Sequence, residues 1–196
     1  MGETALHLCL MNGTNLHKWL AKRIVLIYPK LAIDIFLSEE YYGLSPIHQA
    51  VINEDADMVR FLMFAGNADV NARCVGAFFC PEDQKLSRTD SKEHEWVKFN
   101  TKTNYTGRLY WSEYPLTFAA CLGLGDCVRI LLAKKADLSA QDTNGNTVLH
   151  LMVIHEKLDM FNLTYEMGSR LHVTNKQGLT PLTLAARLAR KEVPAS

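Results

Sequence analysis

Two stretches of the sequence decide the fold: GNTVLHLMV at Gly145–Val153 and GLTPLTLAA at Gly178–Ala186, whose first residues are 33 positions apart. SEYPLTFAA, at Ser112–Ala120, begins another 33 positions earlier. GETALHLCL at Gly2–Leu10 and GLSPIHQAV at Gly43–Val51 share the pattern. Each has a glycine or serine first, leucine or isoleucine at the fifth place, histidine or threonine at the sixth, and apolar residues after it. Self-similarity of this kind predicts a repeat array.

The third and fourth places of the motif predict the start of a short inner helix. Threonine or serine at the third place is an N-cap that accepts a hydrogen bond from an unpaired helical N–H. Proline follows at Pro46, Pro115 and Pro181, where its missing donor costs nothing because this is the first helical position. The apolar spacing of Met58–Ala65 and Cys127–Lys134 predicts a second, outer helix.

A period of 33 residues with a T-P-L-H-x-A pattern is typical of the ankyrin repeat. We therefore predict an all-α fold, an ankyrin repeat solenoid of helix-turn-helix units with extended β-hairpin-like fingers, occupying residues 1–196 as one array. The predicted repeats lie near residues 2–42, 43–73, 112–144, 145–177 and 178–196, the last of them incomplete. Solenoids need capping repeats, and both ends of this array lack one, so we expect a fragment of a longer protein.

The spacing breaks twice. From Gly2 to Gly43 there are eight residues more than the period, which we expect to extend the first outer helix and its finger. From Gly43 to Ser112 there are 36 more than one period, which predicts a long finger insertion at residues 74–111. Insertions in such arrays map to loops on one face, often the binding face.

The insertion is the predicted protein-interaction surface. Its aromatic flanks, GAFF and NYTGRLYW, predict paired strands below a mobile polar tip. The candidate contact residues are Phe78, Phe79, Asp83, Lys85, Arg88, His94, Trp96, Tyr110 and Trp111.

A metal site or a catalytic centre is the competing interpretation of the cysteines and histidines. Cys74 and Cys80 lack the spacing of zinc ribbons, and no second Cys/His pair follows them. His7, His48 and His150 all occupy the sixth motif place, where the other repeats have threonine. A hydroxyl replaces an imidazole as a local hydrogen-bond anchor but not as a metal ligand, so we predict a structural role and no metal.

Composition limits the remaining function classes. The 21 lysines and arginines balance 21 aspartates and glutamates, which removes the driving force for general nucleic-acid binding. Five irregularly spaced cysteines and no secretory signal indicate a reducing compartment. The phosphate-binding, serine-hydrolase and zinc-protease motifs are all absent, so we predict no enzyme, no cofactor and no catalytic residue.

The stretch LHKWLAKRIVLIYPK is basic and amphipathic. Trp19, Lys22 and Arg23 beside bulky apolar residues are typical of a calmodulin target. The alternative, which we favour, is an ordinary outer helix with a solvated basic face.

Six stretches together carry a family resemblance: GETALHL, YYGLSPIH, GAFFCPED, YWSEYPLTFAAC, QDTNGNTVLHLMVI and NKQGLTPLTLAA. This succession resembles the N-terminal cytosolic ankyrin domain of vanilloid-type transient receptor potential cation channels, over essentially the whole chain. EEYYG and PEDQKLSRTDSKEHEW are most similar to the insect and nematode branch, the Inactive-like subunits of sensory cilia.

The resemblance implies a module at the cytoplasmic face of the plasma membrane, or of the ciliary membrane, in a tetrameric calcium-permeable channel. Its partners would be neighbouring channel subunits, with calmodulin as a further candidate, and the membrane would be reached only through another part of the protein. In the family the long finger packs against a neighbouring subunit, which would be Cys74–Trp111 here. The alternative is a generic soluble ankyrin scaffold for an unrelated partner.

Some family members bind ATP on the concave face. The two lysines of that site fall at Glu3 and Leu8, and only Asn12 and Tyr41 match it. A carboxylate in place of an ammonium repels phosphate. The resemblance therefore implies weak ATP binding or none.

Overall fold

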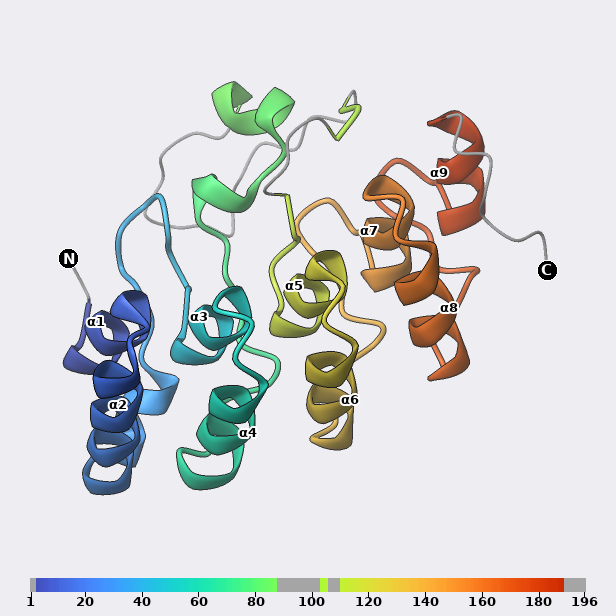
Figure 1. Cartoon of the computed structure of the whole chain (residues 1–196). Coiled ribbons are helices and arrows are strands. Elements are labelled where there is room, and N and C mark those ends of the chain that lie inside the picture. Colours follow the sequence, from blue (N-terminus) through green and yellow to red (C-terminus); the bar gives the residue numbers. More distant parts are fainter. Residues whose placement is uncertain (1–2, 88–102, 106–109, 189–196) are drawn as a thin grey trace.

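The structure, a computed structural model, describes residues 3–87, 103–105 and 110–188. Its helices form antiparallel pairs that stack side by side, which confirms the all-α ankyrin solenoid (Figure 1). The inner helices are α1 (Ala5–Asn12), α3 (Pro46–Ile52), α5 (Pro115–Leu122), α7 (Val148–Ile154) and α9 (Pro181–Arg187). The outer helices are α2 (Asn15–Ile27), α4 (Ala56–Ala65), α6 (Gly125–Ala133) and α8 (Leu158–Glu166). Short 3-10 helices are η1 (Pro29–Ile33), η2 (Ala77–Phe79) and η3 (Glu82–Ser87).

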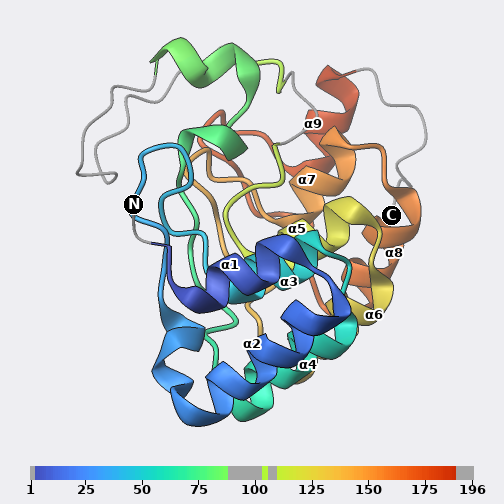
Figure 2. The ribbon, with the colours of Figure 1, turned by 60° about the vertical axis from the view of Figure 1, so that its left-hand side comes forward.

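The inner helices form one row and the outer helices a second row, drawn below the first in Figures 1 and 2, and the fingers extend from the inner row on the side away from the outer helices. None of the described helices is long and apolar enough to cross a bilayer.

The inner helices begin where the motif predicts. Thr4, Ser45, Thr147 and Thr180 are N-caps in the extended conformation. Prolines occupy the first position of α3, α5 and α9. The same local chemistry therefore marks the helix start in four of the described repeats, whereas α5 has Tyr114 at its N-cap and keeps only the proline.

The core runs between the helix pairs as one continuous layer. The leucine or isoleucine at the fifth motif place is almost fully buried in the first four repeats, at Leu6, Ile47, Leu116 and Leu149. Burying such a side chain stabilises the fold by about 1.5–3 kcal/mol. Each repeat thus covers the apolar face that its neighbour exposes, which no single repeat can do for itself.

The first outer helix is longer than the others, as the spacing predicts. Helix α2 has 13 residues, whereas α4 has 10 and both α6 and α8 have 9. The 3-10 helix η1 follows it and packs Ala32 into the core. The remaining excess forms the longer first finger, residues 34–44.

The prediction of paired strands in the insertion is wrong for its described residues. The GAFF segment forms the 3-10 helix η2, and η3 includes Asp83 and Lys85 from the expected polar tip. Residues 103–105 and 110–114 contain no strand either. The aromatic residues that suggested strands instead fill a packed cluster, described below. The predicted mobility of the tip and the candidates Arg88, His94 and Trp96 lie outside the described residues.

Candidate functional site at the base of the insertion

The start of the insertion is bonded to the first finger. The backbone N–H groups of Val75, Ala77 and Phe78 donate to the carbonyls of Tyr42, Glu39 and Glu40, at 2.9, 3.2 and 3.0 Å. The two backbones approach so closely that a Cβ on Gly76 would overlap the carbonyl of Glu40. Only glycine fits such an approach. The insertion therefore leaves the solenoid in a direction fixed by the repeat before it.

An aromatic cluster lies immediately after this junction. The Phe78 and Phe79 rings are edge to face with centroids 5.0 Å apart, and Tyr41 lies 5.0 Å from Phe78. Phe79 continues to Phe118 of α5 at 5.1 Å, and Trp111 lies 5.6 Å from the same ring. Such pairs contribute about 0.5–1.5 kcal/mol each beyond their area burial. The cluster joins both ends of the insertion to an inner helix.

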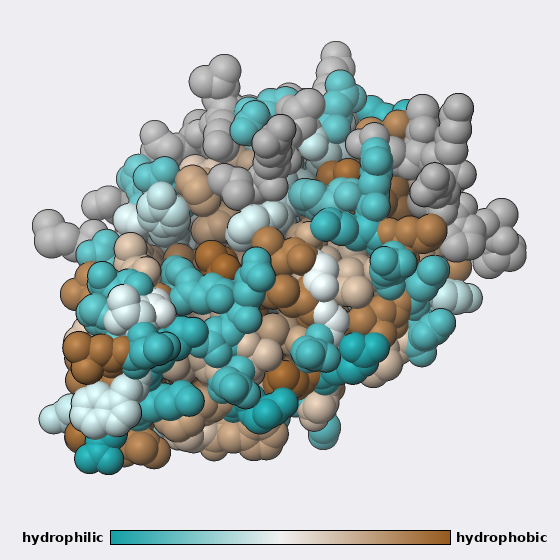
Figure 3. All heavy atoms as spheres, viewed as in Figure 1, coloured by the Kyte–Doolittle hydropathy of each residue, from teal (hydrophilic) through white to brown (hydrophobic). Residues whose placement is uncertain are grey.

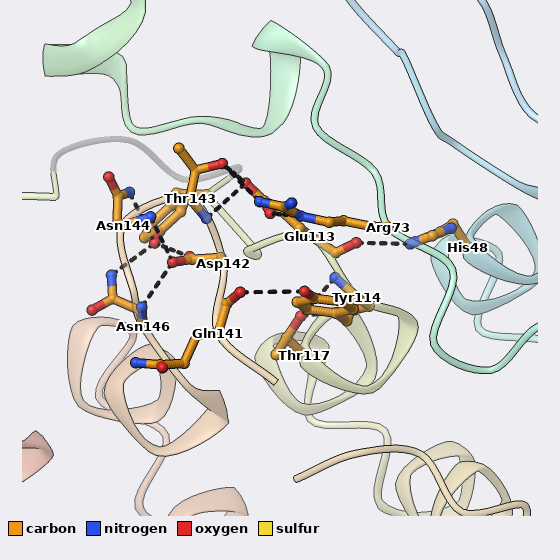
Figure 4. A network of polar contacts seen from close by, with 11 residues as sticks. His48, Arg73, Glu113, Tyr114, Thr117, Gln141, Asp142, Thr143, Asn144 and Asn146 are labelled. Carbon is orange, nitrogen blue, oxygen red and sulfur yellow. Dashed lines mark hydrogen bonds and ion pairs between the residues drawn. The ribbon is translucent and has the colours of Figure 1, made fainter. Parts of the chain in front are cut away.

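Glu113 connects the insertion to two other fingers, as Figure 4 shows. Its carboxylate accepts from Arg73 Nε at 2.6 Å, from the backbone N–H of Thr143 at 3.0 Å and from the Thr143 hydroxyl. Its backbone carbonyl accepts from the N–H of Cys74 at 2.7 Å and from Nε2 of His48 at 3.2 Å. The Glu113 side chain is buried, and a buried carboxylate without partners is strongly unfavourable, so these bonds are needed for the stability of the fold.

Asp142 forms a second centre within the same network (Figure 4). Its Oδ1 accepts from the backbone N–H groups of Asn144 and Asn146, at 2.9 and 2.8 Å, and Oδ2 accepts from the Tyr110 hydroxyl. The side-chain amide of Asn146 donates back to the Tyr110 oxygen at 2.8 Å. Burial, followed by the nearby charge of Glu113, raises the pKa of Asp142 to about 7. Burial also raises the pKa of Tyr110 well above its ordinary value.

The network extends from Asn146 into the next finger. Asn175 Nδ2 donates to Asn146 Oδ1 at 2.9 Å, and the Tyr105 hydroxyl donates to Gln177 Oε1 at 3.1 Å. The Tyr105 and Tyr110 rings stack at 5.7 Å with an interplanar angle of 11°. The return arm of the insertion is therefore bonded to the fingers of two successive repeats.

The structure separates the predicted contact residues into those that hold the insertion and those that face solvent. Phe79 and Tyr110 are buried, whereas Phe78 and Trp111 are half-buried. Asp83 is exposed, yet its carboxylate accepts from the Thr103 hydroxyl at 2.8 Å. The buried side chains therefore set the position of the surface from beneath it.

The histidines have the local role that the motif predicts. In His7, His48 and His150, Nδ1 accepts from the backbone N–H of the N-cap residue three positions earlier. Thr117 and Thr183 accept from their N-caps in the same way. Because Nδ1 accepts, Nε2 carries the proton, and in His150 it donates to the Leu179 carbonyl of the next repeat at 3.0 Å.

The cysteines and potential metal ligands of the described residues are dispersed or buried. The described residues contain no cluster of three or more His, Cys, Asp or Glu side chains that could hold a metal ion. All five cysteines are buried. Burial raises the pKa of Cys121, which disfavours the reactive thiolate.

The other sequence candidates, except Tyr41, lie away from the base of the insertion. Trp19 and Arg23 are exposed on α2, with the guanidinium 6.0 Å from the indole, and Lys22 is half-buried. Asn12 donates its amide to the Leu8 carbonyl at 2.8 Å, and Tyr41 belongs to the aromatic cluster. Each of these residues thus has a structural partner within the chain.

Sequence reasoning missed most of the polar network. Glu113, Asp142, Asn144, Asn146 and Asn175 were not predicted as site residues. The segment QDTNGN does carry a signal, since aspartate and asparagine beside glycine are typical of turns in which the side chain bonds the backbone. That signal predicts the turn, but it does not predict that Asp142 in this turn accepts a hydrogen bond from the distant Tyr110.

Comparison with known families gives the class of protein. Residues 1–74 and 116–193 match the model described as "Ankyrin repeats (3 copies)". The chain belongs to the ankyrin repeat family. The unmatched interval corresponds closely to the insertion.

Individual relatives narrow this class. The chain is 36% identical over 195 residues to transient receptor potential cation channel subfamily V member 6 of Rattus norvegicus, covering 94% of this chain and 22% of that protein. It is 34% identical to member 5 of the same subfamily in Mus musculus, covering 94% and 23%. Member 1 of Canis lupus familiaris is 33% identical over 180 residues, covering 81% and 19%. The chain spans about a fifth of the length of these relatives and is homologous to an ankyrin region of vanilloid-type channels.

Proposed function

We propose that the chain is the cytosolic protein-interaction and subunit-assembly module of a cation channel subunit. The insertion is its contact surface, and the solenoid is the rigid support. The observation that carries the proposal is the anchoring of the insertion at both ends, to the first finger through Tyr42 and to later fingers through Asp142. A segment positioned in this way presents a preorganised surface, which lowers the entropy lost on binding.

The similarity to subfamily V channels supports the finer proposal. The whole protein would be a tetrameric, calcium-permeable and non-selective cation channel of the plasma or ciliary membrane. A sensory role in mechanosensation or osmosensation, and membership of the insect and nematode Inactive-like branch, follow from the resemblance of the sequence. The contacts with neighbouring subunits would be made by the exposed part of the insertion.

The alternative is a soluble ankyrin scaffold for an unrelated protein. Reading the gene beyond the codon for Ser196 distinguishes the two, because a channel subunit requires several membrane-spanning segments. A complete gene without such segments would contradict the channel proposal.

The contact surface is tested in the full-length gene product. Two differently tagged copies are co-expressed, and their association is measured by co-purification from detergent. We expect an Arg88→Glu, Trp96→Ala double variant to reduce association, because both residues are predicted in the exposed part of the insertion. The effect on contact energy would be about 1–3 kcal/mol if these residues are central to the interface.

The matched control is Arg170→Glu, an exposed position after α8 and outside the insertion. We expect it to leave association unchanged. Equal association of the double variant, the control and the wild type would contradict the assignment of the insertion as the contact surface.

A further inference from the structure

A second surface lies on the outer helices, away from the insertion. An open groove of about 460 Å³ runs along α4 and is lined by Lys22, Asp57, Arg60, Phe61, Phe64 and Ala65. Its floor is apolar, and Phe64 exposes 66% of its surface. Figure 3 views this side of the molecule, where hydrophobic and hydrophilic side chains alternate over the outer helices.

Two ammonium groups border the aromatic side chains of α4 from opposite neighbours. Lys22 Nζ of α2 lies 5.6 Å from the centroid of the Phe61 ring, and Lys134 Nζ, at the end of α6, lies 3.9 Å from that of Phe64. Cation–π contacts at exposed sites contribute about 0.5–1 kcal/mol. Neither contact uses a carboxylate, so within the described residues both lysines keep an uncompensated positive charge beside the rings.

The charges around the groove favour an anionic occupant. Among the described residues, neither Lys22 nor Lys134 forms an ion pair. Arg60 is 3.7 Å from Asp57, but both side chains are largely exposed, so this pair is weak. Lys18, by contrast, is already paired with Asp55 at 2.7 Å. The groove thus has Lys22 and Arg60 in its lining beside apolar rings, and Lys134 lies against Phe64 at its edge.

We propose that this groove binds an acidic peptide segment that carries bulky apolar residues between its carboxylates. The apolar side chains would pack on Phe61 and Phe64, and the carboxylates would meet Lys22 and Lys134. A segment lying across α4 in this way would contact three successive repeats. The groove is separate from the insertion. If the groove does not bind an acidic peptide, the proposed function of the insertion is therefore unaffected.

The probe is a fluorescein-labelled nine-residue peptide with leucine at every third place and glutamate elsewhere. Its binding to the 196-residue chain is followed by fluorescence anisotropy. Two further peptides replace leucine by glycine or glutamate by lysine. We expect the acidic, leucine-containing peptide to bind at least about tenfold more tightly than either, and added salt to weaken it.

Three variants and one control locate the site. Lys22→Glu, Lys134→Glu and Phe64→Ser should each weaken binding several-fold, and the two charge reversals together by about tenfold or more. Arg129→Glu, an exposed position on α6 that neither lines the groove nor contacts its aromatic rings, should have no effect. Circular dichroism and the melting temperature verify folding, and Phe64→Ser leaves the charge of the lysines intact.

Three outcomes would overturn the proposal. They are equal binding of all peptides, unchanged binding in the double charge reversal, and loss of binding in Arg129→Glu as well. Sedimentation with phosphatidylserine-containing vesicles provides the competing result: vesicle binding that depends on both lysines, without binding of the acidic peptide, would assign the groove to a membrane surface instead.

Discussion

Different residues hold the two connections α6–α7 and α4–α5 in place. In the regular connection, α6–α7, Asp142 bonds the backbone of its own turn, two and four residues ahead. The longer connection contains the insertion, which begins with bonds to the first finger and ends with Tyr110 bonded to Asp142. A regular finger is thus closed by its own residues, whereas the insertion depends on the fingers of neighbouring repeats.

Acid should weaken two connections between successive repeats, because each contains a buried histidine. His48 bonds the Glu113 carbonyl before α5, and His150 bonds the Leu179 carbonyl before α9. Burial lowers the pKa of His48 and of His150 to about 4. In the unfolded chain the histidines have a pKa of about 6.5 and are therefore protonated at a higher pH than in the folded chain. The stability that comes from the neutral buried histidines is complete above about pH 6.5 and is lost as the pH falls toward 4. Each histidine accounts for up to about 3 kcal/mol. Asp142, whose pKa is raised, has the opposite effect: its protonation stabilises the folded state as the pH falls. This gain offsets the loss of stability from roughly one histidine.

Burial also lowers the pKa of His7 and of His155. We therefore expect a net fall of at least about 3 kcal/mol in the free energy of unfolding between pH 7 and pH 4.5, measured by urea denaturation. His48→Thr and His150→Thr should each reduce this fall, because threonine keeps the cap and does not titrate. Similar slopes in the wild type and in both variants would contradict the assignment of acid sensitivity to these residues.

A comparison of two aspartates tests the dependence of the insertion on its neighbours. Asp142→Ala should lower the free energy of unfolding by about 3 kcal/mol, because two backbone N–H groups and a buried tyrosine lose their partner. Asp137 makes the same kind of turn, accepting from the N–H of Ser139 at 2.8 Å, but is exposed. Asp137→Ala should therefore cost less than about 1 kcal/mol.

Asp142→Asn is the conservative variant, since its amide oxygen still accepts from the backbone. It should recover part of the loss. Urea denaturation measures all three variants, and hydrogen exchange at Tyr110 reports the insertion directly. Equal losses for Asp142→Ala and Asp137→Ala would mean that burial of the network contributes little.

Two glycines give the smallest expected effect. Gly43 and Gly178 both have positive φ, +84° and +73°, but a Cβ on Gly43 would overlap the Arg73 carbonyl where the insertion begins. Alanine at Gly178 meets no atom within 4 Å. We expect Gly178→Ala to cost about 1 kcal/mol from the left-handed backbone alone and Gly43→Ala about 2 kcal/mol. Equal melting temperatures for the two variants would show that the first finger moves to relieve the overlap with only a small loss of stability.

The sequence predicted the regular part of the molecule because its determinants are local. A capping residue, a proline and a buried leucine act within one turn of helix, and their recurrence every 33 residues reveals the solenoid. The same local chemistry explains why histidine and threonine exchange at the sixth motif place. The spacing of the motifs also predicts the length and place of the insertion, at residues 74–111.

Only the tertiary structure decided what the insertion does with its residues. GAFF has the composition of a strand, yet it forms the 3-10 helix η2 because Phe79 packs against Phe118, 39 positions away. Tyr110 binds Asp142 across 32 positions. Such contacts depend on how the repeats stack, and the sequence pattern of a single repeat carries no information about them.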